Sequence, residues 1–150
     1  MLDKLALSLL DAQPECTLCW VTGDGMPAAT VVSYLYADGC LWMTAESHAP
    51  RLRAIARQPQ LAVVVSGTGS KLGHTRCVSL RGHCEMLTDK ATRDWFFPRF
   101  ARRVLPKSRI GARMMAASMN NENNVVLRFT PQWVKTWDAH KAMVMANAMP

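Results

Sequence analysis

Hydroxyl, imidazole and guanidinium groups gather within ten residues of the chain, from Thr44 to Arg53. The segment reads Thr-Ala-Glu-Ser-His-Ala-Pro-Arg-Leu-Arg, with a strand pattern before it and a helix pattern after it. A phosphate dianion is bound by free N–H groups at a helix start, by hydroxyls and by a guanidinium fork. The segment supplies all three, so it is a candidate phosphate site, although the residue types alone favour a different interpretation. That interpretation is a capped helix with solvated arginines.

Two cysteines, Cys16 and Cys19, have the spacing of a metal or redox pair. They fall within a predicted strand, where side chains three residues apart point to opposite faces. A zinc site would need a second pair, and the remaining candidates lack its spacing: His74, Cys77, His83 and Cys84. We therefore expect no metal and interpret all five cysteines as reduced thiols of a cytoplasmic protein.

A basic stripe follows in the second half of the chain, at Arg99, Arg102, Arg103, Lys107, Arg109 and Arg113. Such a stripe could bind nucleic acid, but neither an aromatic stacking pattern nor a known DNA-binding motif accompanies it. We expect instead a solvated helix face, or one that attracts an anionic cofactor or substrate. Nucleic acid is accordingly not an expected partner.

The composition fits one soluble domain spanning residues 1–150. About half of the 150 residues are hydrophobic, which is enough for a hydrophobic core without disulfides or a structural metal. No apolar run approaches the roughly 18–20 residues of a membrane span, so we expect no membrane partner. The formal charge of +7 is compatible with nucleic acid, a membrane surface or a phosphorylated small ligand, and does not choose among them.

The elements that would position these residues alternate between short strands and helices. Apolar periodicity, Gly and Pro predict helices over residues 2–13, 49–58, 90–104 and 108–119, and strands over 16–22, 27–36, 40–44, 61–66, 75–87, 125–129 and 133–137. Asp38-Gly39 marks a tight hairpin, Gly82 a bulge, and Asp89 a helix cap. Six or seven strands joined by short turns favour a closed antiparallel barrel, and the helices make the class α+β.

The second predicted strand, residues 27–36, is apolar on both faces. A strand with one wet face would alternate apolar and polar residues, so this one suits the inside of a barrel or an interface. Since obligate interfaces are large and apolar, it predicts a homodimer.

Between Pro27 and Glu85 the sequence carries an ordered set of motifs. They are Pro-Ala-Ala-Thr-Val-Val-Ser, Asp-Gly-x-Leu-Trp-Met-Thr, Arg-Leu-Arg-Ala-Ile-Ala-Arg-Gln-Pro and Val-Ser-Leu-Arg-Gly-His-Cys-Glu, with Pro-Gln-Trp-Val-Lys-Thr-Trp near the end. This set resembles the pyridoxamine 5′-phosphate oxidase-like, flavin-binding split barrels. The resemblance implies an α+β fold, a six- to seven-stranded antiparallel split β-barrel with flanking helices, and a homodimer that binds flavin mononucleotide (FMN) at its subunit interface.

The resemblance also implies which residues hold the cofactor. The second strand would run along the flavin ring, Met43 and Thr44 would lie by the ring and the ribityl chain, and Arg51 falls where the family has a phosphate-binding Lys. Cys77 takes the place of a Gln that reaches in from the other subunit, and Trp137 matches a Trp near the cofactor. The full implied set is Thr30, Val31, Val32, Ser33, Met43, Thr44, Ser47, His48, Arg51, Cys77 and Trp137.

Three departures from the family's oxidases narrow the expected function. Ala28 stands where they have an Arg, Ser33 where they have a Lys, and no Arg-Leu-His follows Trp137 to hold the vitamin substrate. We therefore expect a short general-stress or unassigned type, an FMN-dependent oxidoreductase that uses a reduced nicotinamide or similar donor on a small-molecule substrate. No catalytic residue is assigned. The alternatives are a carrier of flavin, deazaflavin or haem, and a basic nucleic-acid-binding regulator.

Overall fold

The computed structural model describes residues 2–149, so Met1 and Pro150 of the predicted single domain lie outside the described residues. The four predicted helices are present with shifted ends, and the strands and the end of the chain differ from the prediction at three places described below. The bounds are α1 (Lys4–Ala12), β1 (Glu15–Val21), β2 (Pro27–Ser33), β3 (Leu35–Ala37), β4 (Cys40–Glu46), α2 (Pro50–Arg57), β5 (Gln60–Ser66), β6 (Arg76–Leu87), α3 (Lys90–Val104), α4 (Arg109–Met119), β7 (Asn124–Asp138) and α5 (His140–Asn147).

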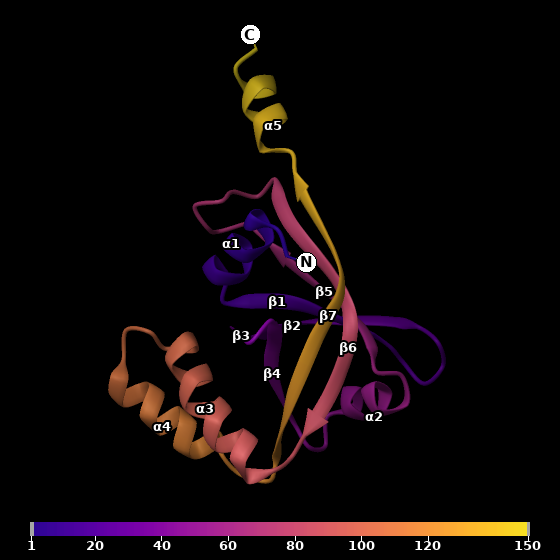
Figure 1. Ribbon diagram of the computed structural model, residues 1–150, viewed down its shortest axis with the longest axis vertical. Helices are drawn as coiled ribbons and strands as arrows, with labels where there is room; N and C mark the ends of the chain where they lie inside the picture. Colours follow the sequence, from indigo (N-terminus) through magenta and orange to yellow (C-terminus); the bar gives the residue numbers. More distant parts are fainter. Residues whose placement is uncertain (1, 150) are drawn as a thin grey trace.

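The seven strands form one antiparallel sheet in the order β2-β1-β5-β6-β7-β4-β3. Although β2 and β3 are separated only by Tyr34, they lie at opposite edges of the sheet. The sheet must therefore curl until its two edges approach each other, and Figure 1 shows β6 and β7 bending around the curl. The fold is the expected α+β split barrel.

Tyr34 explains why the predicted strand over residues 27–36 is two strands. Its side chain is fully buried, its hydroxyl donates to the Leu10 carbonyl at 2.9 Å, and its backbone N–H donates to the Pro14 carbonyl. These contacts with the end of α1 bend the chain away from β1. The described residues therefore contain no ladder between β2 and β3, and the sheet stays open where a closed barrel was expected.

The two strands predicted over 125–129 and 133–137 are instead one, β7. The bulge expected at Gly82 lies opposite the junction, where the register of β6 against β7 shifts between Arg81 and Gly82. A Cβ at Gly82 would lie 2.1 Å from the Thr130 carbonyl oxygen, so this close approach requires glycine. Pro131 is tolerated here because the ladder is already irregular.

Local turn and cap signals in the sequence were accurate. Asp38 and Gly39 both have positive φ, 53° and 73°, as a two-residue hairpin between β3 and β4 requires. The Asp89 side chain caps α3 by accepting from the Thr92 N–H. After Asp138 the chain forms α5, which no sequence pattern had predicted and which projects beyond the end of the sheet in Figure 1.

Two apolar clusters hold the sheet and helices together. The larger fills the inside of the curl, where α1 and α2 contribute Leu9, Leu10 and Ile55. The smaller joins α3 to the other side of β4 and β7 through Phe96, Trp42 and neighbouring residues. No helix within residues 2–149 is long and apolar enough to cross a membrane.

Candidate functional site

The opening in the barrel lies between β2 and the second half of β4. Leu35 pairs with Trp42 in the β3–β4 ladder, and the same register would set Ser33 opposite Thr44. The strands diverge beyond Tyr34, because β2 pairs with β1 while β4 continues along β7. The predicted residues Thr30 to Ser33 thus lie on one side of this split, and Met43 and Thr44 lie on the other.

Both sides of the split present unpaired backbone. Strand β2 pairs only with β1, and residues 43–46 of β4 pair only with β7 within the described chain. Alternate N–H and C=O groups of each edge therefore point into the split. Unpaired donors and acceptors of this kind can bind the polar edge of a planar ring, which suits the main-chain contacts expected of β2.

The side chains of β4 are less available than its backbone. Met43 is fully buried in the inner core, so only its main chain can reach a ligand. Thr44 Oγ1 donates to the Val125 carbonyl at 3.0 Å, which fixes its rotamer and leaves its lone pairs to accept.

Helix α2 begins directly after the split, and its first turn is a candidate anion site. Ala49 at the N-cap makes no side-chain hydrogen bond, and Pro50 occupies the first turn. Arg51 follows, and its Nε is buried without a hydrogen-bond partner in the described chain. A buried guanidinium N–H at an uncapped helix start is unsatisfied until an acceptor binds, so the site fits a phosphate.

Arg57 fixes the other end of α2. Its Nη2 donates to the carbonyls of Val21 and Thr22, at 3.1 and 2.6 Å, which ties the helix to the end of β1. Of the three arginines on α2, Arg51 is the one with a buried N–H that has no partner within the described residues.

Ser47 and His48 lie in the turn between β4 and α2. The Ser47 N–H donates to the Asn123 carbonyl at 2.8 Å. His48 Nε2 lies 3.2 Å from a Glu46 carboxylate oxygen, and both side chains are largely exposed. The turn is held by its backbone, and the two predicted side chains lie at the surface beside the start of α2.

Cys77 and Trp137 form a separate pair. They face each other in the β6–β7 ladder, and Trp137 is 61% exposed. Thr44 pairs with Val126, eleven residues before Trp137 on the same strand. At about 3.3 Å per residue that separation approaches 36 Å along β7, less the shortening at the bulge. Cys77 and Trp137 therefore lie well along the bent strand from Thr44 in the same protomer.

The outer face of the sheet, on strands β2, β1, β5, β6 and β7, exposes several large apolar side chains among polar ones. Helices α1 to α4 pack against the inner core or the smaller cluster, and α5 projects beyond the sheet (Figure 1), whereas Val31, Trp133 and Trp137 are 62%, 40% and 61% exposed on strands of this face. Such a face is typical of a protein interface.

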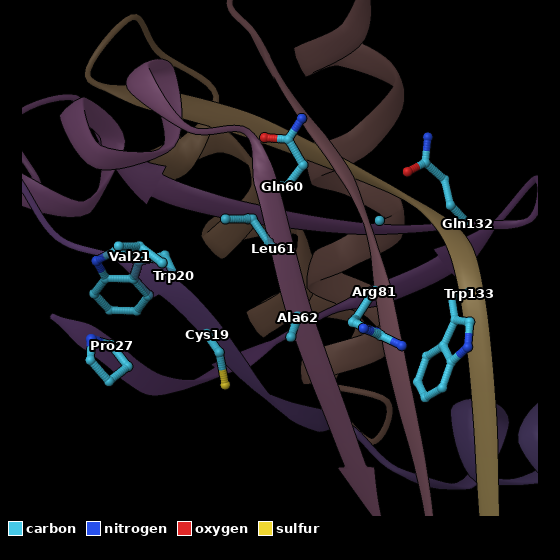
Figure 2. A pocket seen from close by; sticks show the side chains of 11 residues that line it. Cys19, Trp20, Val21, Pro27, Gln60, Leu61, Ala62, Arg81, Gln132 and Trp133 are labelled. Carbon is cyan, nitrogen blue, oxygen red and sulfur yellow. The ribbon is translucent and has the colours of Figure 1, made fainter. Parts of the chain in front are cut away.

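A shallow cavity of about 640 Å³ opens on this face. Figure 2 shows Arg81 beside Trp133, with Cys19 and Ala62 on the neighbouring strands, and the Arg81 guanidinium lies 3.9 Å from the Trp133 ring centre. Sequence reasoning missed these residues, although the apolar pattern on both strand faces was visible. The cavity contains none of the predicted cofactor residues.

The cysteines are all unpaired, as expected. Cys16 is buried in the inner core and Cys19 lines the outer cavity, so the pair does lie on opposite faces of β1. Burial raises the pKa of the Cys16 and Cys84 thiols to about 12. Within residues 2–149 no group of His, Cys, Asp and Glu side chains could hold a metal ion.

A family model described as pyridoxamine 5′-phosphate oxidase matches residues 2–138, nearly the whole chain. The protein belongs to this family. The match covers both sides of the split, the start of α2 and the Cys77–Trp137 pair, so every predicted site residue lies within the matched segment. No curated protein matches the sequence.

Solved structures share the fold of this family member at low sequence identity. The conserved hypothetical protein Rv2991 from Mycobacterium tuberculosis has a TM-score of 0.79 at 19% identity, covering 95% of this chain and 89% of its own. An F420 reductase has a TM-score of 0.66 at 19% identity, with 85% and 94% covered. An FAD-binding protein from Mesorhizobium loti has a TM-score of 0.63 at 21% identity, with 90% and 94% covered.

Proposed function

We propose that this protein is a homodimeric flavoprotein oxidoreductase that binds FMN between two protomers. The observation that carries the proposal is the partnerless, buried Nε of Arg51 at the uncapped start of α2, beside a split with unpaired backbone on both sides. A phosphate would satisfy the first feature and a planar, polar-edged ring the second. Bound flavin would supply the electron chemistry, and the chain would bind and orient it.

The exposed outer face of the sheet supports the proposed dimer. The Cys77–Trp137 pair lies eleven residues along β7 from the position that pairs with Thr44, and Trp137 is exposed on the outer face. A second copy packed on that face would bring its own pair to the split. The homodimer would therefore both bury the apolar face and complete the site.

Two variants test where the phosphate binds. A charge-assisted hydrogen bond contributes roughly 1.5–3 kcal/mol, so Arg51→Ala should weaken FMN binding about ten- to a hundredfold. Riboflavin, which has no phosphate, should bind both proteins equally. Arg53→Ala is the matched control, because Arg53 is exposed on the same helix and should change neither affinity. The measurement is a flavin-fluorescence titration. Equal losses for the two ligands would mean that Arg51 supports the fold and not a phosphate.

A mixing experiment tests the shared site. Arg51→Ala and Trp137→Ala should each weaken FMN binding as homodimers. A mixed dimer contains one protomer with Arg51→Ala and one with Trp137→Ala. Because each site takes Arg51 from one protomer and Trp137 from its partner, one site has both native residues and the other has both substitutions. Half of the sites in mixed dimers should therefore regain wild-type affinity. If Arg51 and Trp137 acted within one protomer, mixing would restore no site, and the proposed assembly would be wrong.

The absorption spectrum separates the cofactor alternatives. If FMN is bound, the protein should be yellow and absorb at about 450 nm, since the intact isoalloxazine ring is the chromophore. A Soret band, or a spectrum that appears only with a deazaflavin, would replace FMN in the proposal. An FMN complex that no reduced nicotinamide reduces would favour the carrier over the oxidoreductase.

A further inference from the structure

Helices α3 and α4 form a hairpin that encloses a second cavity, of about 660 Å³, on the smaller apolar cluster. Its apolar lining includes Leu105, Ile110 and Ala116, and Ile110 is 74% exposed. A volume of this size is within the range of small-molecule sites. The cavity contains none of the residues at the split, so it is separate from the proposed flavin site.

The arginines of this hairpin divide into two groups. Arg93, Arg99 and Arg103 have partners within the protein. Arg93 donates to the Thr88 carbonyl and Arg99 to the Trp95 carbonyl, while Arg103 donates to three carbonyls at the end of α1. These side chains are committed to the fold, so the basic stripe seen in the sequence is not one continuous surface for a polyanion.

The second group is Arg102, Arg109 and Arg113. None of them has a hydrogen bond or ion pair with any residue from 2 to 149, and all three line the same cavity. No Asp or Glu lines it. Three like charges around one cavity repel each other, and an anion bound among them would relieve that repulsion.

The start of α4 adds to the positive potential. Ser108 caps this helix by accepting from the Gly111 N–H at 3.0 Å, and Arg109 and Ile110 form its first turn at the rim of the cavity. The helix dipole therefore has its positive end where the arginines converge.

We infer that the cavity between α3 and α4 binds a small organic anion, with a phosphate or carboxylate head among Arg102, Arg109 and Arg113 and an apolar body along Ile110 and Leu105. An anionic head is expected because guanidinium groups donate in pairs to phosphate and carboxylate oxygens, and no carboxylate side chain of the cavity occupies these donors. An apolar body is expected because the apolar side chains of the cavity are exposed and nothing in the described chain covers them.

Calorimetric titration with octyl phosphate, octanoate and octanol tests this inference. The two anions differ in their head and by one alkyl carbon, which changes affinity by roughly fourfold. A larger difference between them therefore identifies the preferred head. Octanol should bind at least about tenfold more weakly than the better anion, because it has no charge for the arginines. Arg109→Gln and Arg113→Gln should each weaken the better anion about tenfold. Ile110→Ser should weaken both anions, since it shortens the apolar lining.

Two controls make the result specific. Lys107→Gln removes a positive charge from the loop just outside the cavity and should leave the affinity nearly unchanged. Arg51→Ala should also bind octyl phosphate normally, which separates this site from the flavin site. The inference is overturned if Lys107→Gln and Arg113→Gln have equal effects, if octanol binds as well as the anions, or if the protein binds anionic vesicles but none of the three probes.

Discussion

Tyr34 and Arg103 donate to the same carbonyl, and this shared acceptor makes a quantitative prediction. The Tyr34 hydroxyl lies 2.9 Å from the Leu10 carbonyl oxygen, and Arg103 Nη2 lies 3.1 Å from the same atom. Arg103 also donates to the carbonyls of Asp11 and Gln13, at 2.6 and 2.8 Å. The contact joins α3 to the end of α1, at the residue that separates β2 from β3.

Single substitutions leave the Leu10 carbonyl with one donor. Tyr34→Phe should therefore lower the free energy of unfolding by about 0.5–1.5 kcal/mol, the net value of one hydrogen bond. Arg103→Met should lower the free energy of unfolding by more than Tyr34→Phe does, because it also removes the hydrogen bonds to the Asp11 and Gln13 carbonyls. When both are made together, the Leu10 carbonyl loses both partners, and leaving a buried acceptor unsatisfied costs about 1–3 kcal/mol. The double variant should fall below the sum of the singles by at least about 0.5 kcal/mol.

Urea unfolding at fixed protein concentration, followed by far-ultraviolet circular dichroism, measures these free energies. Tyr36→Phe combined with Arg103→Met is the control. The Tyr36 hydroxyl has no hydrogen bond within residues 2–149, so that pair should be additive. If Tyr34→Phe and Arg103→Met also add within about 0.3–0.5 kcal/mol, the shared carbonyl does not couple them, and the reasoning from a common acceptor is refuted.

Two further predictions follow from the bulge and the thiols. Gly82→Ala should destabilise the protein by about 1–3 kcal/mol, because its Cβ would press on the Thr130 carbonyl, and thermal unfolding should show a lower midpoint. Gly25→Ser is the comparison: Gly25 has open space around it but a φ of 84°, so any loss of stability there reports backbone strain and not crowding. Denatured, unreduced protein should titrate five thiols, whereas in native protein Cys16 and Cys84 should react slowest, because burial raises their pKa to about 12. Three or fewer thiols in the denatured titration would contradict the reduced state. These two thiols ionise more readily when the protein is unfolded, so their contribution to stability is complete below about pH 8.5 and declines as the pH rises toward 12. Unfolding midpoints measured across that pH range would show the decline.

Local patterns in the sequence determined the parts of this protein that depend on near neighbours. The start of α2 with Arg51, the Asp38-Gly39 hairpin and the Asp89 cap each rest on contacts within a few residues, and each lies where it was predicted. The bulge at Gly82 was also visible, because glycine inside a strand marks a close backbone approach. Such signals predicted the candidate phosphate site before any packing was known.

Only the tertiary structure decided the features that depend on distant residues. Tyr34 looks like one more apolar position in a strand, and its contact with Leu10 across the fold is what divides β2 from β3 and opens the split. The arginine stripe looks uniform in sequence, but contacts with the end of α1 commit Arg103 to the fold while Arg113 remains at a cavity. Hydrophobic pattern and local propensity specify which segments become helix or strand, whereas partners far along the chain decide which polar groups stay available for a ligand.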